Sequence, residues 1–395
     1  MPITITPYIP RTITVHTGPA GQWAEDVTVS FPEYIKNVAS SEIYPTWNEA
    51  ALRANILAQV SFALNRVYTE YYRSRGYFFD ITGSTQNDQK FIKGRSTFEN
   101  VNRLVDELFN TYIRRKNTVE PLSARFCNGT TSTCSGLSQW GSEELARQGY
   151  SYLDILKHYY GADIELVSNA PIRDVSESYP GTPLRRGSYG NYVTVLQVML
   201  NRVGESYPAI PRIDPVSGFF NQQTETAVRT FQRTFDLAQD GIVGQGTWYK
   251  LVFLYIGLNR LSELLSQGQD YYAVKPPAYG SLREGDSGNL VTALQYFLTI
   301  LSQAGYGIPA VAIDGVFGPL TRQAVMDAQR VFDLPVTGVS DEETSLRLYE
   351  EYLTAVAALG RTQVLPTTPA DIENAILSGQ FPGRDLTLGS SDQGG

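Results

Sequence analysis

Hydrophobic positions near the N-terminus alternate with polar ones, and further along the chain they change to a helical period. Residues 3–31 alternate, with Val15 among the apolar positions, which predicts short strands. The next apolar positions recur in steps of three or four residues: Leu52, Ile56, Val60, Ala63, Val67 and Tyr71. This stripe follows a capping-box pattern with Thr46 and Glu49 at its ends, so we expect a helix that ends near Gly76.

Three further helices are expected in the same part of the chain. Residues 96–99 form a second capping-box pattern, which predicts a helix that continues to Tyr112. Two shorter helices fit residues 139–148 and 152–160. Together with the short strands, these helices predict an α+β domain over residues 1–167.

An internal repeat organises the remainder of the chain. Residues 184–197 read LRRGSYGNYVTVLQ, and residues 282–295 read LREGDSGNLVTALQ. Each copy predicts a unit of three helices and about 70 residues. We therefore expect a multidomain protein in which two small all-α modules, at 184–268 and 282–358, follow the α+β domain. The remaining segments are predicted as linkers at 168–183 and 269–281 and a tail at 359–395.

Composition narrows the class of protein. Apolar residues make up 42% of the chain and charged residues 18%, which gives enough apolar material for packed cores and excludes a disordered protein. The longest apolar run, around residues 251–258, is too short to span a bilayer. The net charge of −8 argues against a nonspecific nucleic-acid-binding protein. The 25 Tyr residues suit a surface that stacks on sugars, although Tyr also fills cores.

The two modules share further motifs of Gly, Asp and Thr. Residues 240–248 of the first copy read DGIVGQGTW, and residues 314–321 of the second read DGVFGPLT. These motifs resemble the peptidoglycan-binding domain 1 family, although Ser345 stands at the Trp position of the second copy. The resemblance implies that each module as a whole binds the cell wall. The alternative is that these Gly and Asp residues only build turns and helix caps.

A second set of motifs lies in the α+β domain. Residues 38–55 read VASSEIYPTWNEAALRAN, residues 80–89 read DITGSTQNDQ, and residues 136–141 read GLSQWG. They resemble the SpoIID/LytB family, the lytic transglycosylases of sporulation, and the arrangement with paired modules is most similar to spore cortex-lytic enzymes. The chain departs from the family pattern at Ile43, which replaces Met, and at Ala50, which replaces Glu.

The resemblance implies a catalytic acid at Glu42. Hydrolytic glycosidases usually need two carboxylates, whereas a lytic transglycosylase uses the 6-hydroxyl of its own substrate as nucleophile, so that one residue serves first as acid and then as base. Ile43, Tyr44 and Trp47 would supply an apolar setting, whereas a position just ahead of a helix favours the ionised carboxylate. The alternative role for Glu42 is a solvent-facing acid, and Glu49 is explained by the capping box.

Polar groups in the other two motifs are candidates for substrate binding, because hydroxyls and amides match the hydroxyl and N-acetyl groups of sugars. The candidates are Ser84, Thr85, Gln86, Gln89, Ser138, Gln139 and Trp140. For the hydroxyls and amides among them, the alternative role is to cap loops.

Cys127 and Cys134 are the two cysteines of the chain, and a disulfide that closes their short loop is the simpler interpretation. Some members of the family bind zinc near this position with Cys and His. The two His residues, His16 and His158, lie far away in sequence, so we expect no metal site and no cofactor. Two reduced thiols are the alternative.

The resemblance implies a function in cell-wall degradation, with peptidoglycan glycan strands as the partner. We expect a lytic transglycosylase outside the cytoplasm, in the cell wall or in the spore cortex or coat, with a role in sporulation or germination. The first ten residues contain no basic residue and no apolar stretch, so we expect no Sec signal peptide. The alternatives are a non-catalytic wall-binding protein and an amidase, which usually needs zinc.

Overall fold

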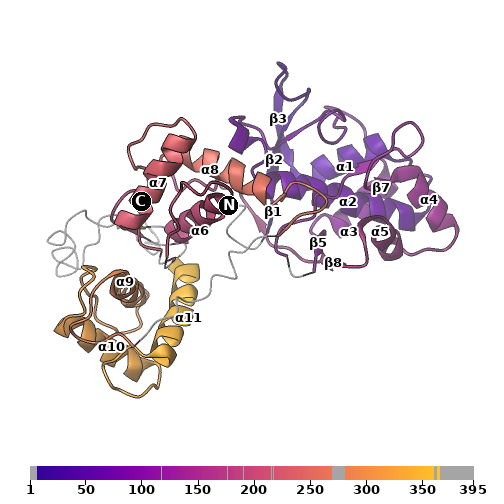
Figure 1. Cartoon of the computed structure of the whole chain (residues 1–395). Helices are drawn as coiled ribbons and strands as arrows, with labels where there is room; N and C mark the ends of the chain where they lie inside the picture. The colour runs from indigo at the N-terminus through magenta and orange to yellow at the C-terminus, as the bar shows by residue number, and fades with distance from the viewer. Residues whose placement is uncertain are drawn as a thin grey trace, which may run out of the picture. The chain divides into compact units, whose positions relative to one another are not determined.

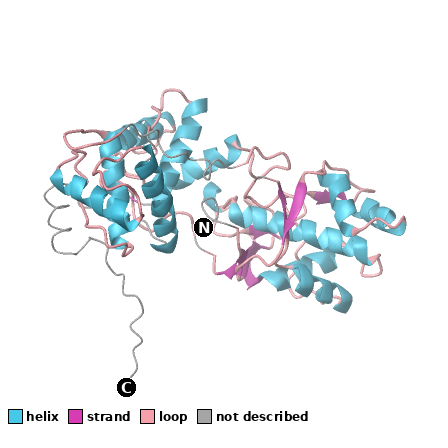
Figure 2. Ribbon diagram, turned by 90° about the horizontal axis from the view of Figure 1, so that it is seen from below, coloured by secondary structure: helices cyan, strands magenta, loops and turns pink. Residues whose placement is uncertain are grey.

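The chain divides into two compact units. The computed structural model describes residues 7–116, 118–175, 177–189, 191–214, 216, 218–268, 281–359 and 363–364. The first unit consists of residues 1–179 and 252–270, and the second of residues 180–251 and 271–395 (Figure 1). Helices form most of the regular structure in the described residues (Figure 2).

A small sheet in the first unit confirms the alternating pattern near the N-terminus. β2 (Thr12–His16) pairs antiparallel with β3 (Asp26–Ser30) and parallel with β4 (Ile81–Thr82). Ile13 and Val15 point into the core and are fully buried. A parallel pair of β1 (Ile9–Pro10) and β9 (Ile172–Arg173) lies in the same unit.

A helix that the sequence pattern did not predict follows β3. α1 (Phe31–Glu42) begins at Ser30, whose hydroxyl accepts a hydrogen bond from the backbone N–H of Glu33 at 3.3 Å. Its buried residues fall at helical spacing: Phe31, Tyr34, Ile35, Val38 and Ala39. Ser30 and Glu33 have the spacing of a capping box, so the signal was present in the sequence.

α2 (Glu49–Tyr68) is the central helix of the first unit. Its predicted stripe from Leu52 to Val67 packs into one hydrophobic core, while Ala54 and Leu57 pack into a second core. A helix that is apolar on all sides is buried on all sides. The N-cap is Asn48 rather than Thr46, and the helix ends at Tyr68 rather than near Gly76.

The predicted capping box at residues 96–99 does not form. α3 (Glu99–Leu108) has Phe98 at its N-cap, and no side chain caps it. The predicted helix is also too long at its C-terminal end. α3 ends at Leu108, and Tyr112, where the prediction ended, begins β5 (Tyr112–Arg115). This strand pairs antiparallel with β8 (Ile164–Val167).

Two predicted helices are confirmed near the end of the α+β region. α4 (Gln139–Arg147) begins at the capping side chain of Ser138, and α5 (Tyr152–Tyr160) begins at that of Ser151. Ahead of them, β6 (Phe126–Cys127) pairs in parallel with β7 (Leu137–Ser138). One further short helix, η1 (Arg73–Arg75), ends at Gly76.

Residues 252–268, called the strap below, belong to the first unit, although the repeat placed them in the first module. The side chain of Asn65 donates to the carbonyl of Leu261 at 2.8 Å, and the hydroxyl of Ser123 donates to the carbonyl of Ser262 at 3.0 Å. Leu261 is fully buried. These contacts attach the strap to α2 and to the chain after β5.

Part of the first predicted linker is also packed into the first unit. Besides β9, Ser178 is fully buried and its backbone N–H donates to Glu70 Oε1 at 2.7 Å. Most of the second predicted linker and most of the tail lie outside the described residues.

The second unit contains the two repeat copies, and each has three helices within the described residues, as predicted. The first copy has α6 (Asn191–Ser206), α7 (Gln222–Thr234) and α8 (Gln245–Leu258), whose last part is assigned to the first unit. The second has α9 (Asn289–Gln303), α10 (Pro319–Val331) and α11 (Glu342–Leu359). A short antiparallel pair joins β10 (Ser188–Tyr189) to β11 (Gln363–Val364).

Four buried Gln residues in the modules each form the same set of hydrogen bonds, called the Gln clasp below. The side-chain oxygen of Gln295 accepts from the N–H of Gly315 at 2.8 Å, and its amide donates to the carbonyl of Val316 at 2.9 Å and to the hydroxyl of Thr321 at 3.1 Å. The other three clasps are built on Gln197, Gln232 and Gln329. Gly315 has φ +76°, which favours glycine. The shared Gly and Thr positions therefore build the fold.

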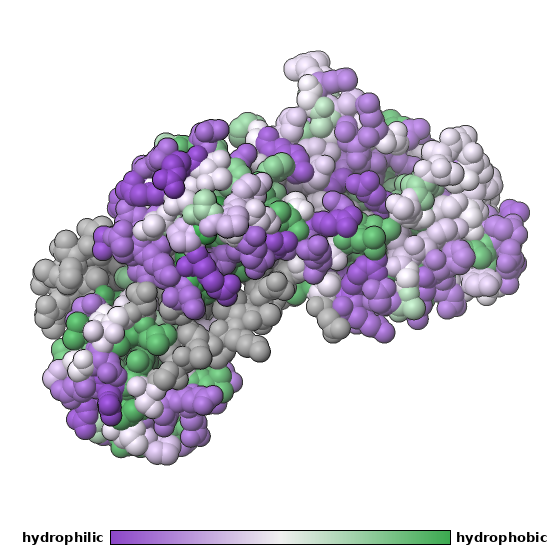
Figure 3. Space-filling view, in the orientation of Figure 1, coloured by the Kyte–Doolittle hydropathy of each residue, from purple (hydrophilic) through white to green (hydrophobic). Residues whose placement is uncertain are grey.

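Many of the described Tyr residues are core residues. Tyr34, Tyr112, Tyr255 and Tyr296 are almost fully buried, whereas Tyr44 is 57% exposed. The face of the molecule in Figure 3 is largely hydrophilic, with scattered hydrophobic patches. Among the described helices, none is both long and apolar enough to cross a bilayer.

Candidate active site

Glu42 is the last residue of α1, and this position differs from the expected one ahead of a helix. Ile43 is the C-cap, and its backbone N–H donates to the carbonyl of Ala39. α2 starts only at Glu49. The backbone carbonyls at a helix C-terminus concentrate negative partial charge, so the helix end beside Glu42 does not stabilise a carboxylate as a helix N-terminus would.

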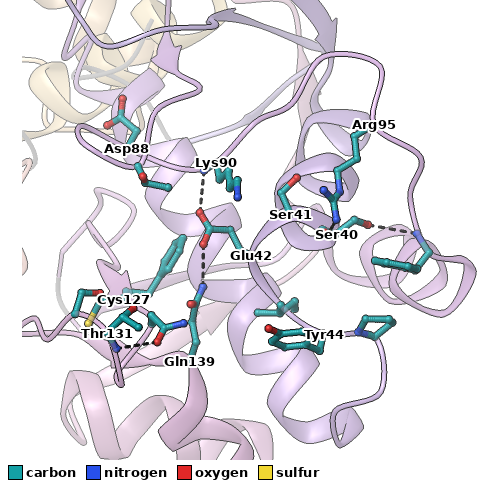
Figure 4. A pocket seen from close by; sticks show the side chains of 17 residues that line it. Ser40, Ser41, Glu42, Tyr44, Asp88, Lys90, Arg95, Cys127, Thr131 and Gln139 are labelled. Atoms are coloured by element: carbon teal, nitrogen blue, oxygen red, sulfur yellow. Dashed lines mark hydrogen bonds between the residues drawn. The ribbon is translucent and has the colours of Figure 1, made fainter.

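Glu42 lines a cavity of about 680 Å³ that is open to solvent (Figure 4). Three parts of the first unit form its walls: the end of α1 with the residues that follow it, the loop of residues 83–91 with Arg95 and Phe98 ahead of α3, and residues 126–132 with the start of α4. Segments distant in the sequence therefore meet around one carboxylate.

Two donors orient the carboxylate of Glu42. The backbone N–H of Lys90 donates to Oε1 at 2.9 Å, and the side-chain amide of Gln139 donates to Oε2 at 3.2 Å (Figure 4). Gln139 is only 2% exposed, so its amide is held in place by the surrounding protein. A carboxylate has about four acceptor positions, so Glu42 keeps acceptor capacity for a substrate.

A second carboxylate of the cavity wall, that of Asp88, is engaged in the protein interior. Arg66 Nε donates to Oδ1 at 2.8 Å, and Thr82 donates to Oδ2 through its backbone N–H at 2.9 Å and its hydroxyl at 2.8 Å. The hydroxyl of Tyr72 also donates to Oδ2. The side chain of Asp88 is fully buried. Burial, and then the charge of Asp88, raise the pKa of Tyr72 well above its usual value.

Three aromatic side chains cluster beside Glu42. The ring centroids of Tyr44 and Trp47 are 5.7 Å apart, those of Tyr44 and Trp140 are 5.6 Å apart, and those of Trp47 and Trp140 are 5.0 Å apart. Trp47 is buried, whereas Tyr44 is 57% and Trp140 is 38% exposed. An exposed pair of rings over a buried one provides an apolar surface on which a sugar ring can stack.

The predicted substrate-binding residues separate into two groups. Gln139 and Thr85 line the cavity with Glu42, and Trp140 belongs to the aromatic cluster. Ser138 instead caps α4, because its hydroxyl accepts from the N–H of Gly141 at 3.0 Å. This contact fits the alternative role given above for Ser138, which is to cap local backbone rather than to bind substrate.

The remaining three candidates do not line the cavity. The hydroxyl of Ser84 accepts from the N–H of Gln86 at 3.3 Å, which is again a capping contact. Gln89 is fully buried and joins the core: its amide donates to the carbonyl of Gln59 at 3.0 Å, and its oxygen accepts from the hydroxyl of Tyr34 at 2.9 Å.

Several cavity residues were missed from the sequence. The donor from Lys90 is a backbone group, so no side-chain pattern marks it. Arg95 also lines the cavity, and its guanidinium donates to the carbonyl of Ser40 at 2.6 Å. Lys90 and Arg95 bring positive charge to a wall that also carries Glu42.

Cys127 and Cys134 form a disulfide in the structure, with their Cα atoms 6.1 Å apart. The closed loop is part of the cavity wall, where it contributes Cys127, Asn128, Thr131 and Ser132. Both ring nitrogens of His16 are engaged, with Asp26 at 2.7 Å and the carbonyl of Gln22 at 2.9 Å. Among the described residues, no three His, Cys, Asp or Glu side chains are grouped closely enough to hold a metal.

Glu49 does not act in a capping box. It is the first residue of α2, and its carboxylate forms ion pairs with Arg53 at 2.7 Å and Arg103 at 3.0 Å. Hydrogen bonds from these two guanidinium groups, Arg53 first, lower the pKa of Glu49. The pair with Arg53 lies within α2, and the pair with Arg103 links α2 to α3.

Comparison with known proteins places the modules in a family. The family model "Putative peptidoglycan binding domain" matches residues 189–251 and residues 287–348. The chain thus combines two helical modules of the peptidoglycan-binding type with an α+β unit.

Two curated proteins are similar to part of the chain. The N-acetylmuramoyl-L-alanine amidase CwlM of Mycobacterium tuberculosis (strain ATCC 25618 / H37Rv) is 32% identical over 130 residues, which cover 33% of this chain and 27% of CwlM. The N-acetylmuramoyl-L-alanine amidase CwlL of Bacillus licheniformis is 28% identical over 174 residues, which cover 44% of this chain and 47% of CwlL. The chain therefore matches less than half of either relative. Neither alignment is long enough to include the whole α+β unit and both modules.

Proposed function

We propose that this protein cleaves the glycan strands of peptidoglycan as a lytic transglycosylase, with Glu42 as the catalytic residue. The observation that carries the proposal is the difference in hydrogen bonding between the two carboxylates in the cavity wall. Asp88 accepts from Arg66, Thr82 and Tyr72, whereas Glu42 keeps free acceptor positions beside Gln139. One available carboxylate fits a reaction in which the substrate supplies its own nucleophile.

In the proposed reaction Glu42 acts twice. As an acid it protonates the oxygen between the muramic acid and the next sugar, and the bond from that oxygen to C1 breaks. The 6-hydroxyl of the muramic acid attacks C1, and the carboxylate of Glu42 takes the proton of this hydroxyl. The product is a 1,6-anhydromuramic end, and no water is consumed. Lys90 and Gln139 hold the carboxylate in one orientation during both transfers.

The surroundings of Glu42 supply groups that suit a sugar chain. Tyr44 and Trp140 offer apolar ring faces, and Gln139 and Thr85 offer amide and hydroxyl groups. Sugar-binding sites combine such rings with a few placed polar groups.

The two modules would hold the enzyme on its polymer. Two linked binding domains raise the effective concentration of the active site near the strand and add avidity. The matches to the peptidoglycan-binding family support this part of the proposal. The proposed location is outside the cytoplasm, in the cell wall or spore cortex, and the proposed relatives are the SpoIID/LytB enzymes and the cortex-lytic enzyme SleC.

Cleavage of the amide between muramic acid and the stem peptide is a second candidate, favoured by the names of the two relatives. The described residues show no cluster of three metal ligands, so they do not fit the zinc that such amidases usually need.

Product analysis tests the proposal. Purified peptidoglycan and spore cortex are incubated with the full chain, and the products are identified by mass spectrometry. The proposal predicts 1,6-anhydromuramic ends. Reducing muramic ends would show a hydrolase that uses water, and released stem peptides with intact glycan would show an amidase. Binding without any cleavage would show a wall-binding protein.

A further inference from the structure

We infer that Asp88 is a positioning residue, which holds the loop of residues 83–91 so that the backbone N–H of Lys90 points at Glu42. This inference rests on the proposed function of Glu42. Asp88 itself lies in the cavity wall with its carboxylate turned into the protein (Figure 4).

The carboxylate of Asp88 accepts hydrogen bonds from two separate elements, from Arg66 on α2 and from Thr82 on β4. Arg66 is 3% exposed, and its guanidinium lies over the ring of Tyr71, 3.8 Å from the ring centroid. A buried carboxylate with this many donors has one stable orientation.

The residue after Asp88 is also anchored in the core. Gln89 is fully buried and connects to Gln59 on α2 and to Tyr34 on α1. Asp88 and Gln89 together fix two successive residues to the core, and Lys90 comes directly after them. The direction of the Lys90 N–H is therefore set by the core rather than by its own exposed side chain.

The backbone N–H of Lys90 is one of the two donors to the carboxylate of Glu42, at 2.9 Å. If this loop shifted, Glu42 would keep only the bond from Gln139, at 3.2 Å. A carboxylate that must deliver and then accept a proton depends on its orientation, and a displacement of about 1 Å can reduce the rate about 100-fold.

The test compares two buried aspartates in the full chain. Asp88→Asn removes the charge that pairs with Arg66. Asp80→Asn is the matched control, because Asp80 is also buried and pairs with Arg73 at 3.2 Å, but it lies outside the 83–91 loop. Initial rates on soluble glycan strands give kcat and KM over a range of pH, and the free energy of unfolding is measured for both variants.

The expected result is that Asp88→Asn lowers kcat about 10-fold or more with little change in KM. We also expect a change in the pH profile of activity, because the variant removes the charge of Asp88, leaves Arg66 without this partner and loosens the loop that carries the Lys90 donor. The Asp80→Asn variant should keep the wild-type kcat and pH profile.

The inference is overturned if Asp88→Asn loses stability but retains the kcat and pH profile of the wild type, or if Asp80→Asn has the same kinetic effect. If Asp88→Asn does not fold, Thr82→Val removes only one donor to Asp88 and should give a smaller effect in the same direction. A wild-type protein that cleaves no glycan strand would overturn the proposed function itself, and this inference with it.

Discussion

At the scale of single residues, burial decides what the titratable side chains do. Glu42 is placed where two donors orient it and solvent still reaches the cavity. Glu70, in contrast, is 4% exposed, and its carboxylate accepts from the backbone and the hydroxyl of Ser178. Two carboxylates of one unit therefore have different surroundings: Glu42 faces an open cavity, and Glu70 is buried against Ser178.

Glu70 gives a prediction about stability and pH. Burial raises the pKa of Glu70 to about 7, although the bonds from Ser178 oppose the shift. A folded-state pKa above the unfolded one means that this group contributes most below about pH 4.5, and that its contribution is lost as the pH rises towards 7. We expect Glu70→Gln to reduce the fall in unfolding free energy between pH 5 and pH 8 by up to about 3 kcal/mol.

Chemical denaturation at both pH values measures this effect, and Glu144→Gln is the control at an exposed position. An unchanged pH dependence in Glu70→Gln would contradict the burial of an ionisable carboxylate at this site.

The aromatic cluster gives a prediction about substrate binding. Trp140→Ala removes one of the two exposed ring faces, so we expect binding of soluble glycan strands to weaken about 10-fold, and Trp140→Phe to restore part of the loss. Tyr150→Ala is the control, because Tyr150 is exposed to a similar degree, 45%, and is not part of the cluster of Tyr44, Trp47 and Trp140. Equal affinities of the Trp140→Ala variant and the wild type for soluble glycan strands would show that the aromatic cluster does not bind the substrate.

At the scale of elements, the helices that the sequence predicts correctly have local signals. α4 and α5 begin at Ser138 and Ser151, whose side chains accept from the backbone three residues later. α1 had a comparable signal at Ser30, but it directly follows a stretch of alternating apolar and polar residues. The change from the strand period to the helical period at this point was therefore not recognised. The strap has no local signal at all, because Asn65 and Leu261 are 196 residues apart in the sequence.

The strap gives a prediction at this scale. Leu261 is fully buried in the first unit, so we expect Leu261→Ala to destabilise that unit by about 2–4 kcal/mol. Leu265→Ala, at a position 63% exposed in the same strap, should change its stability by less than about 0.5 kcal/mol. Hydrogen exchange of α2 peptides in the full chain measures the effect. Equal protection in the two variants would show that the strap does not belong to the first unit.

At the scale of the whole molecule, the sequence predicted the modules more fully than the α+β unit. The Gln clasps join residues 8 to 27 positions apart, so their Gly, Asp and Thr partners repeat as a readable motif. The cavity of the first unit is built from three distant segments, and one of its two donors to Glu42 is the backbone of Lys90. Side-chain patterns identified Glu42 and Gln139, but they could not reveal a backbone donor.

The central claim is that Glu42 is the catalytic residue in the cleavage of glycan strands. The most direct measurement is the rate of formation of 1,6-anhydromuramic ends from purified peptidoglycan by the wild type, by Glu42→Gln and by the control Glu49→Gln. We predict a loss of about 100-fold or more in Glu42→Gln, with wall binding retained, and a near wild-type rate in Glu49→Gln. Anhydromuramic ends formed by Glu42→Gln at the wild-type rate would contradict the account.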